Sequence, residues 1–154
     1  MSVSRKERAG QSHHSLFLLS PDDRDGLTHV VRDLGWQAIA ARRSAGVAQR
    51  YLASDALIAL VDLRGGGDPV PLVSALSPAV EASGGALIIL VEPERLKDVP
   101  VLMQTGATHF LAASPTPEAV EAVLAAAQVM TDRLGGGGRE AGPTPRIRRG
   151  DSLF

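Results

Sequence analysis

The sequence predicts an α/β fold, in which a five-stranded parallel sheet lies between two layers of helices in a doubly wound three-layer sandwich. Two runs, 56–63 and 86–91, are almost wholly apolar, which indicates strands that are buried on both faces. Three shorter apolar runs and segments of helical periodicity alternate with them, as in folds that join parallel strands by helices. Only five residues are aromatic (three Phe, one Trp, one Tyr), so Ala, Val, Leu and Ile must build the core.

The bulk composition narrows the class of protein. A chain of 154 residues with 44% hydrophobic residues can bury one core, and the absence of cysteine excludes disulfides and cysteine-bound metals. No apolar run approaches the roughly 20 residues of a membrane span, and the N-terminus lacks a signal peptide, so a cytoplasmic protein without a membrane partner is expected. Residues 16–134 hold 9 basic and 14 acidic residues, which disfavours nucleic acid as a partner.

The domain is expected to span residues 16–134, between two tails. Residues 1–15 are polar and aperiodic, which predicts a disordered N-terminal tail. Residues 135–154 begin with four glycines and contain further Gly and Pro, which predicts a flexible linker and C-terminal tail. A linker implies a domain beyond it, so the chain is expected either to be the regulatory module of a longer protein or to end in a free tail.

The first strand is expected at 16–19. Ser20 and Pro21 follow it, and their residue types predict the N-cap and the first residue of a helix. This helix should run to Leu34, with Gly35 as its stop. Its apolar face has helical spacing and consists of Leu27, Val30, Val31 and Leu34.

A weaker second strand at 37–41 alternates in polarity and is expected near an edge of the sheet. The helix that follows should end near Ser54 and turn three side chains inward, those of Val47, Tyr51 and Leu52. The run 56–63 is then a central strand that ends on Asp62, at the carboxyl edge where open α/β sheets place their sites. The glycine-rich segment after it lacks the GxGxxG spacing and an immediate helix, which favours a flexible loop over a phosphate-binding one.

The second half of the domain repeats the alternation. The expected elements are a helix at 72–82, a strand at 86–91, a helical segment at 92–105 and a strand at 109–112. Pro100 lies inside the helical segment and is expected to confine regular helix to 101–104. Thr116 is expected to cap a last, alanine-rich helix that ends at Leu134.

Several landmarks in this flavodoxin-like pattern resemble the receiver domain of bacterial response regulators. Leu34-Gly35-Trp36 is similar to the family's Leu-Gly-aromatic ending of the first helix, and Asp62 follows at the family's spacing for the aspartate that accepts phosphate. The run 106–111, Gly-Ala-Thr-His-Phe-Leu, resembles the family's Gly-Ala-Asp-Asp-Tyr-Leu. The resemblance covers residues 16–134 and implies that Phe110 occupies the aromatic switch position.

The catalytic positions of the family are largely changed. The resemblance places Ser20 and Pro21 where receivers have two acids that hold Mg²⁺, Val91 where they have a hydroxylic residue, and Ala113 where they have a lysine. Phosphoryl transfer needs a divalent cation and a positive side chain to neutralise the developing charge. The hypothesis is therefore a degenerate pseudo-receiver: Asp62 is unused, and no catalytic residue, metal or cofactor is expected.

A receiver without phosphorylation chemistry is expected to work through protein contacts. The family's dimer face, made by the fourth helix, fifth strand and fifth helix, would place a homodimer contact on Phe110, Ala122, Ala125 and Ala126. Residues 149–154, Arg-Gly-Asp-Ser-Leu-Phe, resemble the Arg-Asp-x-Leu-Thr entry of diguanylate cyclase (GGDEF) domains. The expected role is thus a regulatory module in bacterial signal transduction that controls such an output domain in a cyclic-di-GMP pathway.

Two alternatives stay open at the level of the sequence. The first is a working receiver that phosphorylates Asp62 and holds Mg²⁺ through atypical ligands, with Asp22 or Asp23 replacing the missing acids. The second is a small flavodoxin-like nucleotide-binding protein that uses the crevice around Ser20, Asp62 and the glycine loop. The second is disfavoured because no base, nucleophile pair or phosphate loop accompanies Asp62.

Overall fold

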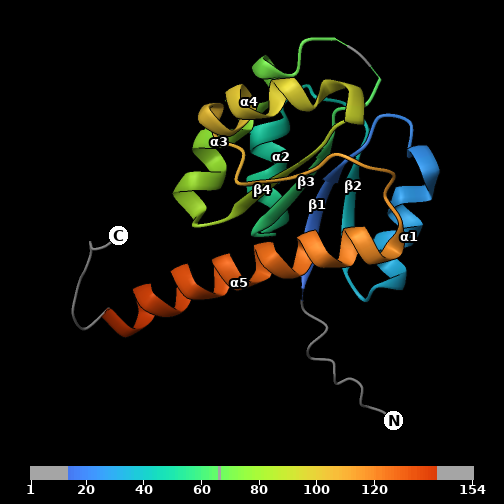
Figure 1. Cartoon of the computed structure of the whole chain (residues 1–154). Helices are drawn as coiled ribbons and strands as arrows, with labels where there is room; N and C mark the ends of the chain where they lie inside the picture. The colour runs from blue at the N-terminus through green and yellow to red at the C-terminus, as the bar shows by residue number, and fades with distance from the viewer. Residues whose placement is uncertain (1–13, 66, 142–154) are drawn as a thin grey trace.

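The structure is a computed structural model and describes residues 14–65 and 67–141. Within these residues the strands form one five-stranded parallel sheet in the order β2-β1-β3-β4-β5 (Figure 1). The strands are β1 (Ser15–Leu19), β2 (Gln37–Ala41), β3 (Ile58–Asp62), β4 (Ala86–Leu90) and β5 (His109–Leu111). The helices are α1 (Leu27–Asp33), α2 (Val47–Ser54), α3 (Val70–Ser83), α4 (Val99–Thr105) and α5 (Pro117–Ala141), with short 3-10 segments η2 (Arg24–Gly26) and η3 (Pro93–Asp98).

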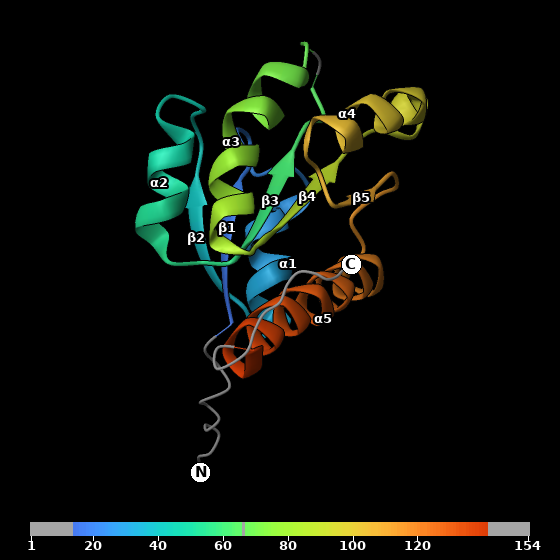
Figure 2. The same ribbon diagram turned by 90° about the vertical axis from the view of Figure 1, so that its left-hand side faces the viewer.

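Helices cover both faces of the sheet (Figure 2). Successive side chains of a strand point to opposite faces, so β1 supplies Phe17 and Leu19 to one core and Leu16 and Leu18 to the other. The first core is closed by α2, α3 and α4, and the second by α1 and α5. The predicted doubly wound sandwich is confirmed.

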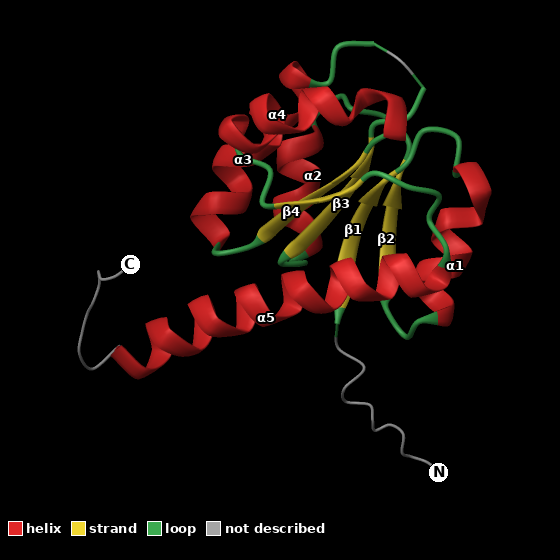
Figure 3. Cartoon of the chain, in the orientation of Figure 1, coloured by secondary structure: helices red, strands yellow, loops and turns green. Residues whose placement is uncertain are grey.

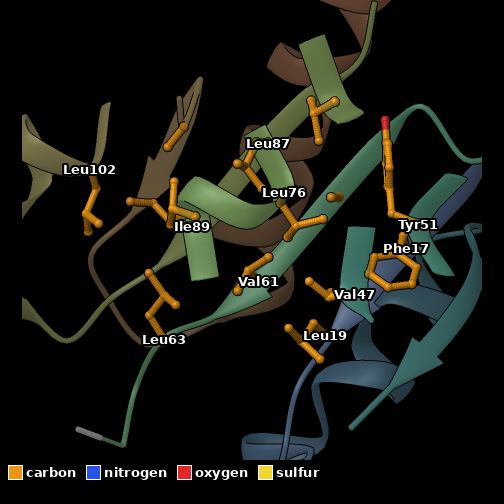
Figure 4. Packing of buried hydrophobic residues seen from close by; sticks show 14 of the residues in the cluster. Phe17, Leu19, Val47, Tyr51, Val61, Leu63, Leu76, Leu87, Ile89 and Leu102 are labelled. Carbon is orange, nitrogen blue, oxygen red and sulfur yellow. The ribbon is translucent and has the colours of Figure 1, made fainter. Parts of the chain in front are cut away.

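The central strands β3 and β4 are buried along their whole length. Every residue of β3 and β4 is buried, as their continuous apolar sequences predict for strands with helices on both faces. Figure 4 shows the first core, in which Val61 of β3 and Ile89 of β4 belong to the same cluster as Leu76 of α3. β2 lies at an edge of the sheet, as its weaker pattern predicts.

The first helix begins later than the sequence pattern predicts. Ser20 does not cap it, because its backbone N–H donates to the carbonyl of Ala41 at 3.0 Å and so continues the pairing of β1 with β2. The side chain of Asp23 instead accepts hydrogen bonds from the backbone nitrogen and the hydroxyl of Thr28, at 2.8 and 2.6 Å. α1 therefore starts at Leu27, and the predicted apolar face is confirmed.

Two further local predictions are wrong. Leu52 does not point inward: half of it (50%) is exposed, and α2 packs through Val47 and Tyr51. Pro100 does not shorten the fourth helix, because it lies in the first turn of α4, where a helix needs no N–H donor. The expected cap of the last helix is confirmed by a 3.2 Å hydrogen bond from the Ala119 nitrogen to the Thr116 hydroxyl.

α5 is longer than predicted. It continues through residues 135–141, past the expected end at Leu134, and Figure 3 shows its C-terminal part extending beyond the strands. Adding residues to an existing helix costs far less than starting one, so a helix anchored on the sheet can run on into a glycine-rich segment. The rest of the two predicted tails, 1–13 and 142–154, lies outside the described residues. None of the described helices has the length and apolar character needed to cross a membrane.

Tyr51 joins α2, α3 and the start of β3. Its hydroxyl donates to the carbonyl of Leu57 at 3.1 Å and lies 2.8 Å from the hydroxyl of Ser83, while its ring stands edge-on to Phe17 at 5.9 Å. Burial raises the pKa of the Tyr51 phenol, and the hydrogen bond with Ser83 opposes that rise. This phenol is thus a neutral structural link in the core.

Removing the hydroxyl by Tyr51→Phe should lower the free energy of unfolding by about 1 kcal/mol, because the polar groups around it lose a buried partner. Urea denaturation monitored by circular dichroism measures this change. Leu52→Ala, one residue along the same helix but exposed, is the matched control and should cost no more than about 0.5 kcal/mol. A larger cost for the control than for Tyr51→Phe would contradict the described orientation of α2.

Candidate functional site

Asp62 is a buried carboxylate at the carboxyl edge of the sheet. It is the last residue of β3, between β1 and β4, and only 3% of its side chain is exposed. The hydroxyl of Ser20, the residue after β1, is buried beside it and donates to Asp62 Oδ2 at 3.4 Å. The structure therefore brings Asp62 and Ser20 together, as the sequence predicts for residues at the ends of adjacent parallel strands.

The Arg64 side chain donates a hydrogen bond to each oxygen of this carboxylate. Its Nε donates to Oδ1 of Asp62 at 2.9 Å and its Nη2 donates to Oδ2 at 2.8 Å, which is the two-pronged geometry that makes Arg–carboxylate pairs strong. The Arg64 backbone nitrogen adds a third hydrogen bond, 3.0 Å to Oδ1. Only 6% of the Arg64 side chain is exposed, so the pair is shielded from water and salt.

A second carboxylate completes the arrangement. Arg64 Nη1 donates to Oδ2 of Asp25 at 2.5 Å, and Arg64 Nη2 also reaches the carbonyl of Arg24 at 3.3 Å. The hydrogen bonds to Asp62 raise the pKa of the Arg64 guanidinium, burial opposes the rise, and Asp25 adds to it. Arg64 is therefore a permanent cation held between two acids.

The acids after β1 do not gather around Asp62 as metal ligands. Asp22 is exposed, Asp23 caps α1 through Thr28, and Asp25 pairs with Arg64. The hydrogen bonds from Thr28 lower the pKa of Asp23, which binds this carboxylate more firmly to its capping role. Within the described residues, no group of three or more His, Asp or Glu side chains is placed to hold a metal ion.

The other positions singled out in the sequence lie on several different elements. Pro21 is exposed, Val91 is buried directly after β4, and Ala113 is exposed after β5. Phe110 on β5 is 43% exposed. The three alanines expected at a dimer face, Ala122, Ala125 and Ala126, are exposed on α5, which packs on the sheet through Val120, Leu124 and Ala127.

A cleft of about 550 Å³ opens beside Asp62. Its floor is formed by the ends of β1 and β3, and its walls by the segments that follow β1, β2 and β3. The residues that line it are Leu19, Pro21, Asp22, Arg42, Arg43, Ser44, Ala45, Asp62, Leu63, Arg64, Gly65, Asp68, Pro69 and Leu72. The Asp62–Arg64 pair thus forms part of the inner surface of a ligand-sized hollow.

Sequence reasoning did not single out Arg64 or Asp25. The signal for Arg64 is a basic residue two positions after a strand-ending acid, a spacing that lets both side chains lie at the same edge of the sheet. Asp25 gave no comparable signal, because its approach to Arg64 depends on a left-handed backbone (φ 63°) inside η2.

The fold is that of solved receiver domains. No family model and no curated protein matches the chain, but a two-component response regulator from Clostridium difficile superimposes with a TM-score of 0.64 at 10% identity, covering 76% of this chain and 97% of that one. The signal receiver domain of a modulated diguanylate cyclase from Desulfovibrio desulfuricans G20 gives 0.62 at 13% identity, covering 77% and 95%. A structure described as an adenylate cyclase from Rhodopirellula baltica gives 0.67 at 14% identity, covering 84% and 97%.

The ion pair can be tested by a double-mutant cycle. Arg64→Gln leaves the buried Asp62 carboxylate without its cation, so the free energy of unfolding should fall by about 2–4 kcal/mol. Asp62→Asn in the same chain removes the uncompensated charge, and the two changes should be coupled by more than about 1 kcal/mol in urea denaturation.

Arg95→Gln serves as the matched control for this cycle. It breaks a more exposed arginine–aspartate pair, Arg95 with Asp98 at 3.1 Å, and should cost less than about 1 kcal/mol. Strictly additive effects of the Arg64 and Asp62 substitutions would refute the pair as a stabilising unit.

Proposed function

We propose that this domain is a pseudo-receiver: it keeps the receiver fold, does not accept phosphate, and regulates a partner or an attached output domain through protein contacts. The observation that carries the proposal is the engagement of both Asp62 oxygens by Arg64 at 2.8 and 2.9 Å. A carboxylate must present a free oxygen to attack a phosphoryl group, and here each oxygen already accepts a hydrogen bond from a buried cation.

The surroundings of Asp62 support the same conclusion. The chemistry needs groups that stabilise charge as it develops on the phosphoryl oxygens. At the positions where receivers supply a hydroxyl and a lysine this chain has Val91, which is buried, and Ala113, which has no functional group. Among the described residues, Arg64 is the cation that pairs with Asp62, and its charge is already neutralised by Asp62 and Asp25.

The proposed output of the domain is a contact surface on β5 and α5. Phe110 and Val129 are 43% and 55% exposed, and the small exposed side chains of Ala122, Ala125 and Ala126 lie between the exposed Glu121 and Val129 on the outer side of α5. We assign a homodimer contact to this surface. α5 also leads into the C-terminal residues, so a change in how two copies pair would reorient whatever follows, such as a diguanylate cyclase domain.

Phosphorylation is the direct test of the pseudo-receiver. Incubation with acetyl phosphate and Mg²⁺ should leave the mass of the chain unchanged, and beryllofluoride with Mg²⁺ should shift the amides around Asp62 no more than inorganic phosphate with Mg²⁺ does. Arg64→Ala should behave in the same way, because the hydroxyl and the lysine are missing as well. An acid-stable, hydroxylamine-sensitive adduct on Asp62 would replace the proposal with the working receiver that binds Mg²⁺ through Asp22 or Asp23.

The dimer contact is tested separately by analytical ultracentrifugation. Placing a carboxylate on the outer side of α5 by Ala126→Glu should weaken self-association at least about tenfold, because a buried unpaired charge costs well over 1.4 kcal/mol. Ala53→Glu, an exposed alanine on α2, is the matched control and should leave the dimer intact. Equal effects of the two substitutions, or a monomer at all concentrations, would remove the contact from the proposal while leaving the phosphorylation result untouched.

A further inference from the structure

One wall of the cleft beside Asp62 is made of hydrogen-bond donors without partners. This wall, residues 42–45, follows β2 and contributes Arg42, Arg43, Ser44 and Ala45 to the cleft. Within residues 14–65 and 67–141, the guanidinium groups of Arg42 and Arg43 make no hydrogen bond or ion pair, in contrast to Arg64 beside them. The hydroxyl of Ser44 and the backbone nitrogens of Ser44 and Ala45 also have no hydrogen-bonding partner in that part of the chain.

Arg42 and Arg43 place two positive charges on one wall of the cleft, which favours an anionic ligand there. Three acids at this edge already accept hydrogen bonds: Asp62 from Arg64, Asp23 from Thr28, and one oxygen of Asp68 from the nitrogen of Val70 at 3.1 Å. Asp22, which also lines the cleft, is exposed. The wall therefore presents guanidinium, hydroxyl and N–H donors together, which is the set that binds carboxylate and phosphate groups in proteins.

The opposite rim limits the charge of a ligand. Asp22 and Asp68 line the cleft from the segments after β1 and β3, and each leaves carboxylate oxygen exposed. These acids would repel a strongly charged polyanion but would accept hydrogen bonds from hydroxyl or amine groups on a small one. The side chains of Leu19, Leu63 and Leu72 supply apolar surface between the two rims.

The position and size of the hollow fit a small molecule. A volume of about 550 Å³ lies within the roughly 300–1,000 Å³ of ligand pockets. The cleft also spans the point where the chain order of the sheet reverses, since β1 has β2 on one side and β3 on the other. Open α/β sheets bind their ligands outside the carboxyl ends of the strands at this point.

We infer that the cleft binds a small organic molecule with a single carboxylate or phosphate group, and that Arg42, Arg43 and Ser44 hold this anionic group. The inference goes beyond the pseudo-receiver role and does not depend on the state of Asp62. A ligand bound in the cleft would contact the segments after β1, β2 and β3 at the same time. Ligand binding would thus be the signal that the domain receives in place of phosphorylation.

The test uses the whole ¹⁵N-labelled chain and two probes, inorganic phosphate and acetate, at constant ionic strength and without Mg²⁺. At least one probe should produce saturable amide shifts centred on residues 42–45, with a dissociation constant below about 10 mM, since these probes carry only the anionic part of the ligand. The probe that saturates identifies the anionic group as phosphate or carboxylate.

Arg42→Gln/Arg43→Gln should weaken that binding at least tenfold while the rest of the amide spectrum stays in place. Arg133→Gln, which removes an exposed arginine from α5, is the matched control and should bind as the parent chain does. Linear shifts with both probes, shifts centred elsewhere, or equal binding by the double variant would overturn the inference. None of these outcomes bears on aspartyl phosphorylation, which is read with Mg²⁺ and at Asp62.

Discussion

The buried pair of Asp62 and Arg64 is the constraint on which the carboxyl edge of the sheet depends. A carboxylate with 3% of its side chain exposed needs a compensating charge, and the chain supplies it from two residues away. The same guanidinium reaches Asp25, so it joins the segment after β3 to the segment after β1. Arg24 then lies 3.8 Å from Glu92 after β4, and Arg95 donates to the carbonyl of Gly67 at 3.2 Å, so arginines connect three segments at this edge.

A guanidinium fixed in the chain differs physically from a metal ion in the same place. Mg²⁺ keeps open coordination positions and water, so it can gather a phosphoryl donor and a carboxylate in one shell. Arg64 has no such position, because its donors already serve Asp62, Asp25 and the carbonyl of Arg24. Neutralising Asp62 in this way stabilises one arrangement of the site; in the proposed pseudo-receiver it takes the place of the change in charge that drives a phosphorylation switch.

The sequence predicts the sheet well because its signals are local and redundant. The runs that become β3 and β4 are apolar except for Asp62 at the end of β3, and such runs are stable when helices bury both of their faces. The errors have a different origin: Ser20 has the type of an N-cap, yet pairing with Ala41 holds it to the sheet, and Leu52 fits a helical stripe but lies outside the contact of α2. Asp62 could be located by its strand, whereas Arg64 and Asp25 are brought together by loop conformations that carry no periodic signal.

If Asp62 does not accept phosphate, a signal must reach the domain and be passed on through other elements. The segment after β1 lies between the cleft and α1: Asp22 lines the cleft, and Asp23 holds the first turn of α1 through Thr28. α1 in turn shares an apolar cluster with α5, through Leu27 and Val31 on one helix and Leu124 on the other. Packed cores move between discrete arrangements and do not deform continuously, so a ligand that acts on α5 through α1 must favour one arrangement of α1 over another. In the proposed pseudo-receiver, α1 is therefore one element that links the cleft to the helix that leads out of the domain.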